Sequence, residues 1–338
     1  MASVKYGLVA KLLSGIFVFS WIAMGSLHAE ESSYRVVATY KVSGTGRIAA
    51  LAVDTTGNRL YLARGNSVAV LNAGSGATLG TIEAAPGVSG VALASDFNRG
   101  FTSNSAGDSI TIFDTRSLKT IATVKSPGGS PTAIDYDSES RRVFVSNSSG
   151  SVTVLDAASG AVVGTIKLGG KPGQLISNNY GQLFVLDTGG NTVHVIDTKL
   201  LKNLGSFPAG TGENCSGLAL DPVGRRLFVA CGNHDLAVID TDIGFAFQEL
   251  PIGSGLAGDA FTFSPTGAGG WKGAIFVASS DGTLSILQMN AFIRYLPGFT
   301  MKLPPGIHSV VFDPKTHRLF VPAPAGNHGA WQVLVVAK

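Results

Sequence analysis

One sequence unit recurs along the 338-residue chain, and this recurrence constrains the fold more than any other feature. In each copy an aromatic residue with small or aliphatic neighbours follows a polar turn, as in LFVA at 227–230. The aromatic residues of the seven copies are Tyr61, Phe101, Phe144, Phe184, Phe228, Phe276 and Phe320. Successive copies are separated by 40, 43, 40, 44, 48 and 44 residues. Such a period predicts a repeat architecture in which one small structural unit is copied seven times.

Each copy carries the pattern of four short antiparallel strands joined by turns. Around Phe228, an apolar strand at 218–221 enters the turn DPVGRR, and the aromatic strand returns from it. A third strand ends at Asp240, and a fourth follows after another turn. Asp, Pro and Gly favour such turns because Asp bonds to nearby backbone groups, Pro presets φ and Gly tolerates positive φ.

Units of four strands at this spacing are typical of a β-propeller. The 44 glycines and the low charged fraction of 14% fit a chain of many strands and tight turns. A lone four-stranded sheet exposes two edges, so the copies must form a closed ring. We therefore predict an all-β, seven-bladed β-propeller with four antiparallel strands per blade, as a single domain over residues 30–338.

The two ends of the domain supply the closure of the ring. The seventh copy has only three strands before the chain stops, and a spare strand pattern lies at 34–42. We expect this N-terminal strand to complete the last blade.

The first 29 residues differ from everything that follows. Lys5 and Lys11 form a basic start, residues 12–24 form an apolar run, and Ala29 offers a small residue before a cleavage point. This order predicts a signal peptide at 1–29 and a periplasmic or secreted mature protein. The alternative is an uncleaved membrane anchor, although the run is shorter than the roughly 20 residues that a spanning helix needs.

Charge balance limits the class of partner. Cleavage after Ala29 leaves 23 basic and 22 acidic residues, which does not support a uniformly basic surface for nucleic acid. We expect a small polar ligand or a protein partner rather than nucleic acid, no spanning segment after signal cleavage, and a monomer.

The strand motifs resemble those of a known family. The segments FVSN at 144–147 and FTSN at 101–104, followed by strands such as SVTVLD at 151–156, are similar to the YVTN-repeat, YncE-like seven-bladed propellers. The resemblance spans about residues 33–338 and implies the fold but no single chemistry. The G-H and W-D dipeptides of WD40 repeats are missing from the chain.

Function is expected in the loops on one face of the ring. In folds of this kind the first strand of each blade lines the channel, and ligands bind where the loops entering it meet those joining strands two and three. The predicted ligand-binding residues are Arg47, Arg64, Lys171, Glu213, Asp259, His234, His308 and His328. This mixture of charges suits a small polar or anionic ligand, or a peptide segment.

Three of these residues are also weak candidates for a metal site. His234, His308 and His328 are placed in loops of one face, and Glu213 or Asp259 could complete a site. No H-x-x-x-H or H-E-x-x-H spacing supports it. We expect no cofactor, with a divalent metal as the alternative.

The chain lacks the familiar catalytic motifs. It has no G-x-S-x-G elbow, no C-x-x-C-H haem motif and no glycine-rich nucleotide loop that opens a helix. We therefore expect an exported, non-catalytic module that binds a ligand or a protein. The alternatives are a metal-assisted, lactonase-like hydrolase and an accessory protein of a periplasmic redox pathway.

Two cysteines flank the first hairpin of the fifth copy. Cys215 precedes the first strand and Cys231 follows the second, so folding of the hairpin brings them almost opposite each other. In an oxidising compartment this placement predicts a disulfide. A register slip of one residue would put the two side chains on different faces of the sheet.

A possible partner surface lies on the opposite face of the ring. Copies five and six carry aromatic residues in their turns, namely Phe245, Trp271 and Phe292. If exposed together, they form an apolar patch for a partner. The alternative is that they fold back over the blade edges.

Overall fold

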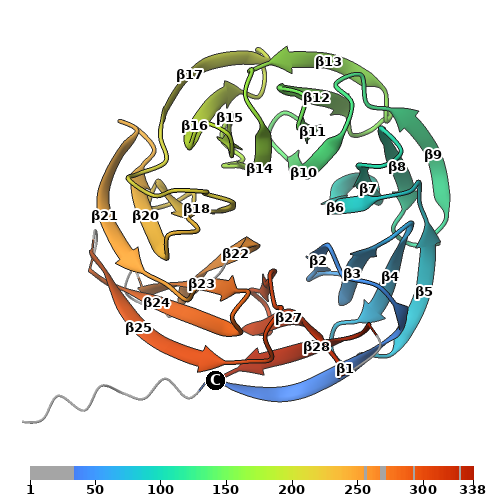
Figure 1. Ribbon diagram of the computed structural model, residues 1–338. Helices are drawn as coiled ribbons and strands as arrows, with labels where there is room; N and C mark the ends of the chain where they lie inside the picture. Colours follow the sequence, from blue (N-terminus) through green and yellow to red (C-terminus); the bar gives the residue numbers. More distant parts are fainter. Residues whose placement is uncertain (1–33, 255–256, 267–271, 292–293, 327–328) are drawn as a thin grey trace, which may run out of the picture. The chain divides into compact units, whose positions relative to one another are not determined.

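The computed structural model describes residues 34–254, 257–266, 272–291, 294–326 and 329–338. These residues form seven sheets of four antiparallel strands, arranged as a ring around a central axis (Figure 1). The prediction of a seven-bladed β-propeller is confirmed. The described residues contain one short 3-10 helix, Ser95–Phe97, and no helix long and apolar enough to cross a membrane. The predicted signal peptide at 1–29 lies outside the described residues.

Each blade follows the strand order read from the sequence. Blade 1 contains β2 (Ala50–Asp54), β3 (Arg59–Arg64), β4 (Ser67–Asn72) and β5 (Thr78–Glu83), and blade 2 contains β6 (Val88–Ala94), β7 (Arg99–Asn104), β8 (Ser109–Asp114) and β9 (Thr120–Lys125). Blade 3 contains β10 (Pro131–Asp137), β11 (Arg142–Asn147), β12 (Ser151–Asp156) and β13 (Val162–Lys167), and blade 4 contains β14 (Pro172–Ser177), β15 (Gln182–Asp187), β16 (Thr192–Asp197) and β17 (Lys202–Pro208). Blade 5 contains β18 (Gly217–Asp221), β19 (Arg226–Ala230), β20 (Asp235–Asp240) and β21 (Phe245–Pro251), and blade 6 contains β22 (Ala257–Thr266), β23 (Lys272–Ser279), β24 (Thr283–Ala291) and β25 (Arg294–Lys302). Blade 7 contains β26 (Val311–Asp313), β27 (Arg318–Pro324), β28 (Ala330–Ala337) and β1 (Arg35–Thr45).

The N-terminal strand closes the ring, as predicted. β1 pairs antiparallel with β28, with Arg35 opposite Ala337 and Tyr40 opposite Val333 (Figure 1). The buried Tyr40 hydroxyl lies 3.0 Å from the carbonyl oxygens of Ala73 and Gly74 in blade 1. The closing strand therefore joins blade 7 both to the C-terminus and to the first blade.

The seven repeated aromatic residues form the packing between blades. Each of them is fully buried, which stabilises the fold by roughly 1.5–3 kcal/mol per side chain. Each of them lies in an apolar cluster shared with the next blade, in some cases ring against ring, as in Tyr61 with Phe113 and Phe228 with Tyr295, whose ring centroids are 5.9 and 5.1 Å apart. The residue that recurs in each sequence copy is thus the one that packs each blade against the next.

The two faces of the ring carry different connections. We call the face with the loops that enter the first strands the mouth face, and the opposite face the turn face. On the turn face, the last residue of a third strand caps the following turn: Asp156, for example, accepts a hydrogen bond from the Ser159 N–H.

A repeated arginine joins neighbouring blades on the turn face. In blades 1, 3 and 7 the first residue of the second strand (Arg59, Arg142 and Arg318) donates a hydrogen bond to a turn carbonyl of the next blade, whereas Arg226 at this position of blade 5 pairs with Asp240 of its own blade. Arg142 Nη1, for example, lies 2.7 Å from the Thr198 oxygen. We call this contact the arginine clasp. It holds the outer part of one blade against the next.

Removal of the closing strand tests the ring. Deletion of residues 34–45 leaves β28 as an unpaired edge and removes the buried Tyr40, so we expect loss of the cooperative thermal transition measured by circular dichroism. The control Val37→Ser changes an exposed side chain of the same strand and should melt like the wild type. An unchanged transition in the deleted protein would contradict this role.

Asp135 gives the fold a specific pH dependence. Its carboxylate, in β10, accepts hydrogen bonds from the Ser177 N–H of β14 at 2.8 Å and from the Tyr136 N–H at 2.9 Å. Burial raises the pKa of Asp135 to about 6, more than these hydrogen bonds lower it. The unfolded value is about 3.9, so its contribution to stability is fully present below about pH 4 and lost as the pH rises through about 6.

We expect the free energy of unfolding of the wild type, relative to Asp135→Asn, to fall between about pH 4 and pH 7. Urea denaturation across this window measures the difference. A difference that stays constant with pH would show that Asp135 titrates alike in the folded and unfolded states.

Candidate functional site

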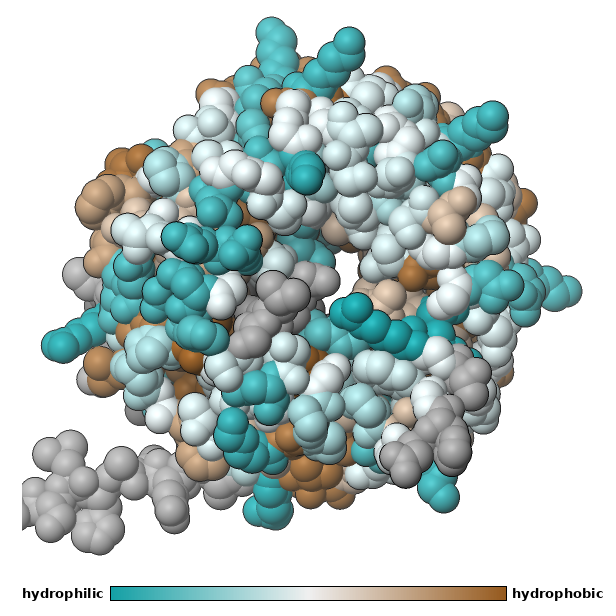
Figure 2. Space-filling view, in the orientation of Figure 1, coloured by the Kyte–Doolittle hydropathy of each residue, from teal (hydrophilic) through white to brown (hydrophobic). Residues whose placement is uncertain are grey.

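The predicted ligand residues lie in loops of the mouth face, but only some of them are close to one another in the structure. Figure 2 shows an opening at the centre of the ring with hydrophilic residues along part of its rim. The described members of the predicted set are Arg47, Arg64, Lys171, Glu213, His234 and His308. The Asp259 side chain and His328 lie outside what the structure describes.

Arg47 and His308 are in direct contact across the seam between blades 1 and 7. Arg47 lies in the loop between β1 and β2, and its Nε is 3.0 Å from His308 Nε2. His308 lies ahead of β26 and is buried, with Nδ1 3.1 Å from the Gly306 oxygen and its ring 5.5 Å from that of Trp331. The imidazole thus serves as a fixed support for the arginine.

The protonation state of His308 decides what it can do for Arg47. Burial, with a smaller effect from the Arg47 charge, lowers the pKa of His308, while hydrogen bonds to the Gly306 and Ile48 carbonyls raise it in part. The two contacts of Nε2 exclude each other: a neutral ring protonated on Nδ1 donates to the Gly306 oxygen and accepts from Arg47 Nε, whereas a neutral ring protonated on Nε2 donates to the Ile48 oxygen and offers Arg47 no acceptor there. Protonated His308 would instead donate to the Ile48 oxygen, 2.7 Å from Nε2, and repel the guanidinium.

Arg64 lies at the end of β3, beside the segment that leads to Arg47. A Cβ atom added at Gly44 would lie only 2.7 Å from Arg64 Nη2, and Gly44 has a φ of +86°. Glycine at position 44 therefore lets the guanidinium pack under this segment. Arg64 Nη1 is buried and finds no hydrogen-bond acceptor among the described residues.

We call Arg47, Arg64 and His308 the seam cluster. The ion pairs formed within the described ranges lie elsewhere, at Lys199–Glu139, Arg225–Asp242, Arg226–Asp240 and Lys302–Asp281. Neither seam arginine therefore forms an ion pair with a carboxylate of those ranges. Such an arrangement can accept an anion through charge-assisted hydrogen bonds.

The other predicted residues lie in separate loops. The Lys171 N–H donates to the Asp187 carboxylate at 2.7 Å in blade 4, and Lys171 is exposed. Glu213 is also exposed, and His234 has a φ of +71° with Nδ1 3.4 Å from the Gly253 oxygen. None of these residues contacts the seam cluster. Within the described ranges, no three His, Cys, Asp or Glu side chains converge as a metal site.

Several polar residues at the ends of the second strands hold loops together. Asn104 is fully buried and donates to the Thr111 hydroxyl at 3.0 Å. Asn147, equally buried, accepts from the Ser126 hydroxyl at 2.7 Å. These positions keep the mouth-face loops in place, so a polar residue here is no sign of ligand contact.

The predicted disulfide between Cys215 and Cys231 is present and buried. A straight ladder from the Gly217–Ala230 pair would leave the two cysteines one residue out of register. The segment ahead of β18 departs from this ladder, where the Ser216 N–H donates to the Ala230 oxygen at 3.0 Å, and the two cysteines come together. The bond ties the Glu213 loop to the His234 loop.

Of the three residues predicted to form a partner patch, the structure describes only Phe245. Phe245, the first residue of β21, is 61% exposed on the turn face. Trp271 and Phe292 lie outside the described residues. The neighbouring Ile243 is 74% exposed, so an apolar surface exists beside Phe245.

Loss of the disulfide should weaken the fold. A bond that closes a loop of this length contributes about 2–4 kcal/mol, so the double variant Cys215→Ser, Cys231→Ser should unfold at lower urea concentration by that amount. Dithiothreitol should bring the wild type to the same midpoint and leave the variant unchanged. Equal midpoints for the oxidised wild type and the variant would refute this contribution.

Comparisons with known proteins support the fold but assign the chain to no family. No family model and no curated protein matches the chain. Among solved structures, hydrazine synthase of Kuenenia stuttgartiensis is similar, with 17% identity, a TM-score of 0.74, and coverage of 88% of this chain and 97% of that one. The structure of U3-55K is 13% identical, with a TM-score of 0.73, and the match covers 89% of this chain and 98% of that one. The structure of the RRP9 WD40 repeats is 13% identical, with a TM-score of 0.74, and the match covers 90% of this chain and 98% of that one. At these identities the likeness shows the β-propeller fold alone.

Proposed function

We propose that the protein is an exported, YncE-like β-propeller that acts as a non-catalytic binding module for an anionic ligand at the seam cluster. The observation that carries the proposal is the buried Arg64 Nη1, which lacks an acceptor among the described residues. A buried donor of a charged group left unpaired costs about 1–3 kcal/mol or more. An anion that supplies an acceptor oxygen there would remove this cost, and its entry requires the Gly44 segment, which packs on the guanidinium, to move aside.

The chemistry of the cluster favours a carboxylate or phosphate group. A guanidinium presents several N–H donors in a planar fork that matches two oxygens of such a group. Arg47 supplies a second guanidinium, whose Nε lies 3.0 Å from His308 Nε2, and burial of His308 disfavours a further positive charge there. The site thus offers donors and positive charge, with no built-in carboxylate to displace from the described residues.

The periplasm is the proposed location. Two observations support this location: the buried disulfide favours an oxidising compartment, and the basic and apolar order of residues 1–29 resembles a signal peptide. The FVSN and SVTV motifs support a place among the YncE-like propellers.

Titration with succinate and with inorganic phosphate, followed by isothermal calorimetry, tests the site. We expect Arg64→Gln to weaken binding of the preferred anion by about 10- to 100-fold, because a hydrogen bond to a charged group is lost. Lys171→Gln removes a positive charge from the same face in blade 4 and should leave binding unchanged. Equal affinities of the wild type and Arg64→Gln, or equal losses in both variants, would contradict the seam site.

A further inference from the structure

A groove of about 230 Å³ opens on the turn face between blades 4 and 5. Its lining residues are Asn178, Tyr180, Gln182, Leu220, Pro222, Val223, Arg225, Thr241 and Asp242. Pockets for small-molecule ligands usually measure about 300–1,000 Å³, so this groove has the size for one long side chain. It lies on the face opposite the seam cluster, and its role is independent of the function proposed there.

The groove lies where an arginine clasp is missing. Gln182 is the first residue of β15 and so holds the position that Arg59, Arg142 and Arg318 hold in other blades. Its side chain stays in its own blade, where Oε1 accepts a hydrogen bond from Asn178 Nδ2 at 3.1 Å. Gln182 therefore does not reach across to blade 5.

The backbone carbonyls that would accept a clasp at this junction are present, and no described donor bonds to them. Thr241 and Asp242 are the first two residues after β20, as Thr198 and Lys199 are after β16. Thr198 and Lys199 both offer their carbonyl oxygens to Arg142, at 2.7 and 2.8 Å. Among the hydrogen bonds of the described residues, none ends on the carbonyl oxygen of Thr241 or Asp242.

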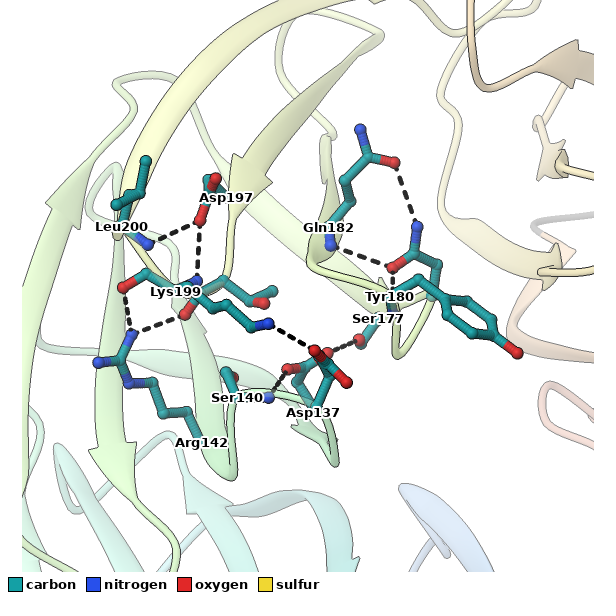
Figure 3. A network of polar contacts seen from close by, with 12 residues as sticks. Asp137, Ser140, Arg142, Ser177, Tyr180, Gln182, Asp197, Lys199 and Leu200 are labelled. Atoms are coloured by element: carbon teal, nitrogen blue, oxygen red, sulfur yellow. Dashed lines mark hydrogen bonds and ion pairs between the residues drawn. The ribbon is translucent and has the colours of Figure 1, made fainter.

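The junction between blades 3 and 4 shows what a filled junction looks like. There Lys199 pairs with Glu139, the Ser177 hydroxyl donates to Asp137, and the Arg142 clasp completes the network (Figure 3). Tyr180 points away from this network, toward blade 5 as its place in the groove requires (Figure 3). Between the turns 177–182 and 221–226 or 241–242, by contrast, the described residues form no hydrogen bond or ion pair across the junction.

The walls of the groove suit a guanidinium. Tyr180 is 74% exposed, and an arginine stacks well on such a ring. The chain already uses this contact on the turn face, where the Arg141 guanidinium lies 5.7 Å from the Phe97 ring centroid and that of Arg226 lies 5.1 Å from Phe247.

The charge at the groove also admits an arginine. Asp242 pairs with Arg225 through Oδ2 at 2.8 Å, and both side chains are well exposed, so this pair is weak and leaves the backbone carbonyls free for another donor. The neighbouring junction tolerates a similar second cation, because Lys199 lies beside the Arg142 clasp.

We propose that the groove between blades 4 and 5 docks an arginine side chain of a partner protein, whose guanidinium donates to the Thr241 and Asp242 carbonyls and stacks on Tyr180. The arginine of the partner takes the place that Arg59, Arg142 and Arg318 fill at three other junctions. The exposed Ile243 and Phe245 lie in the same turn region of blade 5 and offer apolar contact to the flanking residues of the partner.

The variant Gln182→Arg tests the proposal, because it supplies the missing clasp from within the chain. It should raise the melting temperature and occupy the groove. Gln182→Met is the matched control, since it keeps a side chain of similar length without a guanidinium and should leave the groove open.

The probes are the peptides acetyl-Gly-Leu-Arg-Leu-Gly-amide and its lysine counterpart, titrated by NMR. We expect the arginine peptide to bind the wild type and Gln182→Met at least about tenfold more tightly than the lysine peptide, and Gln182→Arg to lose this binding. Equal binding of both peptides, undiminished binding to a folded Gln182→Arg, or no binding at millimolar concentration would overturn the proposal. Self-association that Gln182→Arg abolishes would also overturn it, because a second copy would then be the occupant.

Discussion

Pairing of β1 with β28 is the interaction on which the rest of the structure depends. Each blade buries its aromatic residue against a neighbour, so no blade is complete alone and the ring must be closed. The closing strand also runs directly into the mouth face. β1 ends at Thr45, and the chain continues through Gly46 to Arg47. The strand that closes the ring thus delivers one of the two seam arginines.

The seam cluster combines groups from both ends of the chain. His308 comes from blade 7 and Arg64 from blade 1, while the glycine-containing segment after β1 lies between them. Because Arg47 contacts His308, and the segment 44–46 packs on Arg64, only when the ring is closed, a ligand bound to these groups would be coupled to closure. A ligand held by Arg47 and Arg64 would stabilise the seam against opening.

The repeat made the fold predictable, whereas the candidate site is formed by residues that differ from one copy to the next. Strand order, the number of blades, closure at 34–42 and the disulfide all followed from periodicity and spacing. The contact of Arg47 with His308 joins residues 261 positions apart, so no local pattern indicates it. The groove at Gln182 could have been found in the sequence, because glutamine replaces arginine at a repeated position. The sequence alone does not show what that change does, because the carbonyl oxygens that the other arginines bind are known only from the structure.

The central claim is that the seam arginines receive an anion. Arginine side-chain ¹⁵N–¹H NMR, recorded during titration with succinate or phosphate, tests it most directly. We expect saturable shifts of the Arg64 and Arg47 resonances, while those of the clasp residues Arg59 and Arg142 stay in place. Shifts of equal size at all arginines, or none at Arg64, would contradict it.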